Sequence, residues 1–127
     1  MSDELYRARI LDHAKTPRNR GVMQDATIEE RGSNPTCGDR LTLYLKVEGD
    51  TIAAASFAGE GCAISTAAAS LLTERLQGLP VTDAQVLGEQ DIYDMLGVAV
   101  GPGREKCALL AWRALQAGLR EFTVPGS

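Results

Sequence analysis

The chain has 127 residues with 44% hydrophobic and 24% charged side chains, values typical of one globular domain, and we expect a single domain over residues 1–127. The formal net charge of −4 and the few aromatic residues argue against general attraction to polyphosphate, so nucleic acid is not an expected partner. No run approaches the roughly 18 apolar residues of a membrane span, and the acidic start Met1-Ser2-Asp3-Glu4 is unlike a targeting peptide. We therefore expect a cytoplasmic protein without a membrane partner.

The N-terminal half predicts a helix followed by antiparallel strands. Ser2 can cap a helix that ends before Pro17, because the residue before a proline avoids the helical region. A basic loop over residues 17–24 and a short strand over residues 26–31 follow. A period-2 alternation then predicts a strand with one buried face, formed by Leu41, Leu43, Leu45 and Val47. Residues 48–51 form a turn, so that residues 52–58 can return antiparallel.

The C-terminal half predicts helices. An apolar stripe begins after Cys62 and is closed by Gly78 and Pro80. Thr82 and Asp83 can cap a short helix through Leu87, residues 89–96 can form another, and a Gly-rich loop covers residues 97–103. The last helix is expected over residues 104–117, with Gly118 ending it. This order predicts an α+β domain with helices on one face of a small antiparallel sheet.

The sequence contains three cysteines, and each one follows or precedes a predicted element. Cys37 stands in Asn34-Pro35-Thr36-Cys37-Gly38-Asp39-Arg40, Cys62 follows Gly59-Glu60-Gly61, and Cys107 follows Arg104-Glu105-Lys106. An odd number of cysteines without the spacing of a secreted scaffold indicates a reducing compartment. No Cys-x-x-Cys signature is present, so spacing alone does not establish a metal site. Taken singly, each cysteine could also be a small buried hydrophobe.

The surroundings of the cysteines nevertheless favour thiolates. Cys37 stands in a Pro- and Gly-containing turn, Cys62 at a helix start, and Cys107 beside Lys106. With Asp39, the three thiols offer the four ligands of a tetrahedral zinc site with a local charge of about −2. Nearby cations available to compensate this charge are Arg40, Arg104 and Lys106. The carboxylate of Asp39 would be the weakest ligand for a soft metal, which makes such a site labile.

Four segments together resemble the U-type iron–sulfur cluster assembly proteins, the family of IscU, the N-terminal part of NifU, and SufU. They are His13-x-x-x-Pro17-Arg18-Asn19-x-Gly21, residues 34–39, Gly59-Glu60-Gly61-Cys62-Ala63-Ile64-Ser65, and Lys106-Cys107-Ala108-Leu109-Leu110-Ala111-Trp112. The resemblance spans nearly the whole chain. It implies an α+β fold with a three-stranded antiparallel sheet, and a metal or cluster site at Cys37, Asp39, Cys62 and Cys107.

The sequence combines features of two branches of this family. Gly-Glu-Gly-Cys at residues 59–62, Lys106 before the third cysteine and Arg104 are similar to SufU. The insertion that SufU proteins carry between the second and third cysteines is absent, which is similar to IscU. The Leu-Pro-Pro-Val-Lys chaperone-docking motif of IscU is missing, so docking of an Hsp70-type chaperone is not expected.

The resemblance implies two uses of the same ligands. A SufU-like protein binds Zn²⁺ and accepts sulfur from a cysteine desulfurase of the SufS or IscS type, with Cys37 as acceptor. A scaffold instead holds a transient [2Fe-2S] cluster and passes it to apo iron–sulfur proteins, where a poor ligand such as Asp39 aids release. In either case the chain is a scaffold or sulfur-transfer accessory protein rather than a stand-alone enzyme.

Other interpretations remain open from the residues themselves. The metal could be structural zinc in an interaction module without sulfur transfer. A thiol enzyme with Cys37 as nucleophile and His13 as base is a third possibility, although His13 is the only histidine and better suits helix packing. The same thiolates serve zinc and an iron–sulfur cluster, so the sequence leaves both occupancies open.

Overall fold

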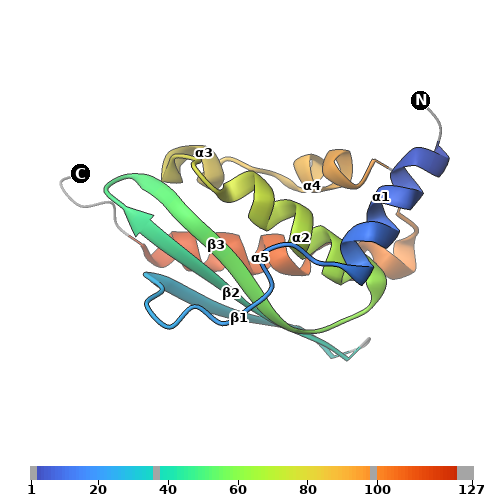
Figure 1. The fold of residues 1–127 in the computed structure, drawn as a ribbon, viewed down its shortest axis with the longest axis horizontal. Helices are drawn as coiled ribbons and strands as arrows, with labels where there is room; N and C mark the ends of the chain where they lie inside the picture. The colour runs from blue at the N-terminus through green and yellow to red at the C-terminus, as the bar shows by residue number, and fades with distance from the viewer. Residues whose placement is uncertain (1–2, 36–37, 98–99, 123–127) are drawn as a thin grey trace.

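An antiparallel sheet of three strands forms one layer of the structure (Figure 1). The computed structural model describes residues 3–35, 38–97 and 100–122. The strands are β1 (Ile28–Asn34), β2 (Asp39–Glu48) and β3 (Thr51–Glu60), and they lie in the order β1-β2-β3. Glu48 pairs with Thr51, so β2 and β3 are joined by the predicted tight turn, in which Gly49 has a φ of 64°.

The predicted alternation of β2 is confirmed over most of the strand. Leu41, Leu43 and Leu45 are buried on the side of the sheet that faces the helices. A β-bulge between Lys46 and Val47 shifts the register, and Val47 is only partly buried. The strand therefore has a buried face, and beyond the bulge its pairing with β3 continues to the turn in a register shifted by one residue.

The helices lie together on one face of the sheet (Figure 1), which confirms the predicted α+β architecture. They are α1 (Asp3–Lys15), α2 (Ala63–Leu76), α3 (Val81–Gln85), α4 (Glu89–Leu96), η1 (Pro102–Arg104) and α5 (Glu105–Glu121). Helix α2 packs on β3, α5 packs on β1 and β2, and the two helices contact each other. Helices α1 and α4 pack on this inner pair. The core between the sheet and the inner helices includes the fully buried residues Leu43, Leu45, Ile52, Leu72, Leu76 and Leu115.

A crossing segment, residues 19–27, covers part of the other face of the sheet. At its start, Phe57 in β3 donates its N–H to the Asn19 carbonyl at 3.0 Å. At its end, the N–H of Thr27 donates to the Leu45 carbonyl at 2.8 Å, next to the start of β1. The segment therefore passes from one edge of the sheet to the other. It leaves Tyr44 only 7% exposed, although the strand alternation turns this side chain away from the helices.

Three predicted boundaries are wrong. The first strand covers Ile28–Asn34 instead of residues 26–31. Helix α3 is capped by Pro80, whose carbonyl accepts the N–H of Ala84 at 3.1 Å, and not by Thr82. Helix α5 continues through Gly118 to Glu121.

Gly118 has a packing role and does not end the helix. A Cβ at this position would lie 2.8 Å from Cγ2 of Ile28 in β1. The absence of a side chain is what lets α5 approach the edge strand at this point. Among the described residues, no helix is long and apolar enough to cross a membrane.

Candidate metal centre

Three of the four predicted ligands meet at one end of the sheet. Asp39 is the first residue of β2, Cys62 caps the N-terminus of α2, and Cys107 lies in the first turn of α5. Their ligand atoms all lie within 4.8 Å of one another. Arg40 pairs with Glu60 at the end of β3, so the hairpin returns the chain to Asp39 just before it reaches Cys62. These separations suit two thiolates and a carboxylate around one metal ion or a small cluster.

The buried carboxylate of Asp39 has one oxygen that protein groups leave unpaired. Asp39 is 2% exposed, and its Oδ1 accepts the backbone N–H of Cys62 at 3.0 Å. Its Oδ2 is buried and, within the part of the chain that the structure describes, has no hydrogen-bond partner. A buried anionic oxygen without a partner is destabilising unless a cation lies beside it. A metal ion bound between Oδ2 and the two sulfurs would supply that cation, so the donor set fits a metal.

The thiol of Cys62 lies in a site that stabilises its thiolate. Burial of the thiol acts against ionisation, but hydrogen bonds from the backbone and side chain of Ser65 and from Cys107 outweigh it. The pKa of Cys62 is therefore lower than that of an ordinary cysteine. Only glycine fits at position 61 without displacing the Ser65 hydroxyl, because a Cβ there would lie 2.2 Å from the Ser65 Oγ.

Cys107 is 1% exposed, and the side-chain amide of Asn34 contacts its Sγ at 3.8 Å. Asn34 ends β1 and pairs with Asp39 across the sheet, so the same strand pairing holds the amide and the carboxylate near the thiol. Arg104 and Lys106, the predicted compensating cations, are exposed residues at the start of α5. Within residues 3–35, 38–97 and 100–122, no ion pair joins either cation to Asp39.

Cys37, the predicted sulfur acceptor and fourth ligand, lies outside the described residues together with Thr36. Its role remains a prediction. Sequence reasoning missed the contributions of Asn34 and Ser65. Both residues occur in the quoted motifs. Ser65 lies three residues after Cys62 at a helix start, where its N–H and hydroxyl face the N-cap residue Cys62, and this position could have indicated its role.

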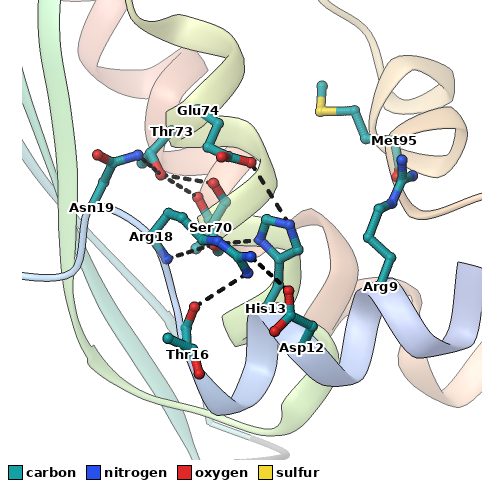
Figure 2. Close-up of polar contacts among 11 residues, drawn as sticks. Arg9, Asp12, His13, Thr16, Arg18, Asn19, Ser70, Thr73, Glu74 and Met95 are labelled. Atoms are coloured by element: carbon teal, nitrogen blue, oxygen red, sulfur yellow. Dashed lines mark hydrogen bonds and ion pairs between the residues drawn. The ribbon is translucent and has the colours of Figure 1, made fainter.

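His13 belongs to a separate contact between α1 and α2 (Figure 2). It is 5% exposed, its Nδ1 lies 2.7 Å from the Ser70 hydroxyl, and its Nε2 lies 3.7 Å from a carboxylate oxygen of Glu74. The N–H of Arg18 also donates to Ser70, at 2.8 Å. His13 thus takes part in the packing of α1 on α2, as the sequence predicted.

Comparison with known proteins identifies the family. A family model described as the NifU-like N terminal domain matches residues 5–125. The chain belongs to this family. Zinc-dependent sulfurtransferase SufU of Bacillus subtilis (strain 168) is 40% identical to this chain, and the alignment covers 92% of this chain and 90% of the relative. The iron–sulfur cluster assembly scaffold protein IscU of Thermotoga maritima is 37% identical, over 95% of this chain and 96% of the relative.

A solved structure of a related protein has a similar fold. It is described as a candidate iron–sulfur cluster assembly scaffold protein for the SUF system of Fervidobacterium islandicum AW-1, and its TM-score is 0.75 at 31% identity, over 94% of this chain and 99% of the other. The resemblance stated from the sequence motifs is therefore confirmed. This member of the NifU-like N-terminal domain family is similar to SufU and to IscU at nearly equal identity.

Proposed function

We propose that this chain is an assembly protein for iron–sulfur clusters that accepts sulfur from a cysteine desulfurase at a zinc site. The ligands would be Cys37, Asp39, Cys62 and Cys107, with Cys37 as the sulfur acceptor. One observation carries the proposal: two thiols and a carboxylate from separate elements meet within 4.8 Å, and the carboxylate keeps one buried oxygen without a protein partner. The zinc-dependent relative supports the choice of metal.

Each residue of the centre has a separate part in this chemistry. Zinc supplies positive charge that keeps cysteine ligands deprotonated at neutral pH. Asp39 holds the start of α2 through the Cys62 N–H, which fixes one sulfur relative to the carboxylate. Ser65 stabilises the thiolate of Cys62 in the metal-free protein. The exposed cations Arg104 and Lys106 offset the negative charge of the ligand set from the solvent side.

Sulfur transfer then proceeds by thiol–disulfide exchange. The Cys37 thiolate attacks the outer sulfur of a persulfide on the desulfurase, a new S–S bond forms at Cys37, and the S–S bond of the desulfurase breaks. The desulfurase cysteine leaves as a thiolate, the proton of the attacked persulfide stays with the transferred sulfur or passes to solvent, and no net oxidation occurs. The partner is a desulfurase of the SufS or IscS type, and apo iron–sulfur proteins receive the product.

Scaffolding of a transient [2Fe-2S] cluster is the second candidate function. The hard carboxylate of Asp39 among soft thiolates favours it, because one weak ligand lets a cluster leave. The IscU relative supports this use of the site. We further propose that the chain acts as one domain in the cytoplasm, where thiols remain reduced, and that it has no docking site for an Hsp70-type chaperone.

Metal analysis and the Cys37→Ser variant test these functions together. The protein is purified anaerobically, analysed for zinc, iron and acid-labile sulfide, and added to a SufS-type desulfurase with cysteine. We expect one zinc per chain and stimulated turnover for the wild-type protein, and no stimulation by Cys37→Ser with an unchanged far-UV circular dichroism spectrum. The exposed residue Thr82 in α3 provides the control Thr82→Ala, which should behave as wild type.

Each other result selects a different function. Undiminished stimulation by Cys37→Ser refutes the acceptor role. Iron and sulfide in equal amounts, transferable to an apoprotein, support the scaffold. Zinc without any effect on the desulfurase, with unfolding on metal removal, indicates a structural zinc module.

A further inference from the structure

Two hollows lie on either side of the end of β1, next to the candidate metal centre. The first, the open-face hollow, has a volume of about 400 Å³ and lies on the sheet; its lining includes Arg31, Arg40 and Thr42. The second, the helix-side hollow, has a volume of about 140 Å³; its lining includes Arg31, Lys106 and Arg113. Both are bounded by the β1 residues 31–33, so they meet along this strand.

The charges that line these hollows are all positive, although the whole chain carries a net charge of −4. Arg31, Arg40, Lys106 and Arg113 are all exposed, and no aspartate or glutamate lines either hollow. Glu60 is the cross-strand neighbour of Arg40 but is part of neither lining. Among the described residues, the ion pairs of the protein lie elsewhere, at Asp12, His13 and Lys46. A cluster of cations that form no ion pair among the described residues, in an acidic protein, indicates a binding surface for negative charge.

The strand between the hollows has an open edge. β1 is an outer strand of the sheet, and within the part of the chain that the structure describes no segment pairs with its outer side. The opposite edge, on β3, is covered by residues 19–21 of the crossing segment. An unpaired edge can accept an extended peptide as a further strand.

The floors of both hollows are apolar and suit side chains of an added strand. Ala58 lines the open-face hollow, and Leu110 and Ala114 line the helix-side hollow. Successive side chains of a strand point to opposite faces of a sheet. A strand added to β1 would therefore direct alternate side chains toward the two hollows, where each meets an apolar floor and an arginine or lysine rim.

We propose that an extended acidic segment of a partner protein docks along the outer edge of β1, with its carboxylates bound by Arg31, Arg40 and Arg113. Arginine binds carboxylates with two parallel hydrogen bonds, which gives the surface its selectivity. Nucleic acid fits less well, because no aromatic side chain lines either hollow to stack with bases, and the net negative charge of the chain repels a polyphosphate.

The position of this surface connects it to the candidate metal centre. Asn34, which lines the helix-side hollow, contacts the sulfur of Cys107, and Lys106 precedes that cysteine. A partner held along β1 is therefore brought to the thiol-bearing end of the sheet. That this partner exchanges sulfur or a cluster rests on the proposed function, whereas the docking of an acidic segment is tested independently of it.

NMR titration of the ¹⁵N-labelled, zinc-loaded protein tests the docking directly. The probe is a nonapeptide that repeats Glu-Glu-Val-Val, so that both faces of an added strand carry carboxylates. The controls are the same peptide with lysine in place of glutamate and a thymidine dodecanucleotide. We expect the acidic peptide to shift amide signals of residues 31–34, 40–42 and 110–114, more weakly at higher salt. The double variant Arg31→Glu/Arg113→Glu should bind at least about tenfold more weakly.

The variant Arg7→Glu/Arg75→Glu is the matched control. It makes the same change in net charge at exposed residues of α1 and α2 that line neither hollow, and it should bind the peptide as the wild-type protein does. Equal weakening by both double variants would show that only net charge matters and would overturn the inference. Binding of the oligonucleotide in place of the acidic peptide, or no binding of either, would overturn it as well.

The desulfurase assay separates this inference from the proposed function. If the peptide binds at β1 but the protein neither binds zinc nor affects a desulfurase, the docking surface stands and the proposed function fails. If zinc binding and Cys37-dependent stimulation are found without peptide binding at β1, the proposed function stands and the docking surface fails.

Discussion

Asp39→Asn separates the two effects of the buried carboxylate, because it removes the charge while conserving the shape of the side chain. The amide oxygen can still accept the Cys62 N–H that Oδ1 accepts at 3.0 Å. In the metal-free protein, Oδ2 is buried without a partner among the described residues, and such a group costs about 1–3 kcal/mol. We therefore expect the metal-free variant to be more stable than the wild-type protein by about 1–2 kcal/mol.

With zinc, the order of stability should reverse. Loss of a charged ligand should weaken zinc binding at least about tenfold, the loss typical of even an outer-shell change. Zinc stabilises the folded state by an amount that grows with the logarithm of the ratio of free zinc concentration to the dissociation constant of the zinc complex. Because the variant has the larger dissociation constant, zinc stabilises it less.

Thermal unfolding with and without zinc measures both effects. A stability change of 1 kcal/mol shifts Tm by about 3–4 °C in a domain of this size, so the metal-free variant should melt about 3–8 °C higher. The control Asp50→Asn changes an exposed turn carboxylate and should move neither curve. If Asp39→Asn leaves metal-free Tm unchanged or lower and retains full zinc affinity, the reasoning on the unpaired oxygen is refuted.

Three further changes have expected outcomes. Ser65→Ala removes a hydrogen bond to the Cys62 thiolate, so the pKa of Cys62 should rise and its alkylation by iodoacetamide in the zinc-free protein should need higher pH, as followed by peptide mass spectrometry. His13→Asn should flatten the pH dependence of stability. Gly118→Ala should lower the free energy of unfolding by about 1–2 kcal/mol in urea titrations, because the new Cβ would lie 2.8 Å from Ile28 Cγ2.

The sign of the His13 effect follows from the direction of its pKa shift. Burial and the nearby Arg18 charge lower the pKa of His13 in the folded protein below its ordinary value of about 6.5. His13 therefore binds a proton more readily in the unfolded chain than in the folded protein. The contribution of His13 to stability is complete above about pH 6.5 and is lost as the pH falls toward its pKa in the folded protein. His13 is the only histidine, so a wild-type curve parallel to that of His13→Asn between about pH 7 and 5 would contradict this assignment.

The other two changes have equally specific contrary outcomes. If Ser65→Ala leaves the alkylation profile of Cys62 unchanged, Ser65 does not stabilise the thiolate. In an unstrained helix interior, alanine is more favourable than glycine by about 1 kcal/mol, so a stability gain in Gly118→Ala would show that α5 does not depend on close packing there.

Local patterns in the sequence determined the elements and the chemistry. The alternation of Leu41, Leu43 and Leu45 determined a strand with one buried face, and the turn at Gly49 determined its antiparallel return, because both depend on neighbouring residues. The ligands Asp39, Cys62 and Cys107 were named from their residue types and motifs, whereas their meeting depends on how α2 and α5 pack against the sheet.

Contacts between distant segments were decided only by the tertiary structure. Local rules predict that the helix ends at Gly118, yet α5 continues to Glu121. Packing of this part of α5 against Ile28 buries apolar surface, and this burial outweighs the low helix propensity of glycine. The unpaired Oδ2 of Asp39, the contact of Asn34 with Cys107, and the cations gathered around β1 each join residues far apart in the chain. Such neighbours depend on the path of the whole backbone, and no periodicity or spacing in the sequence records them.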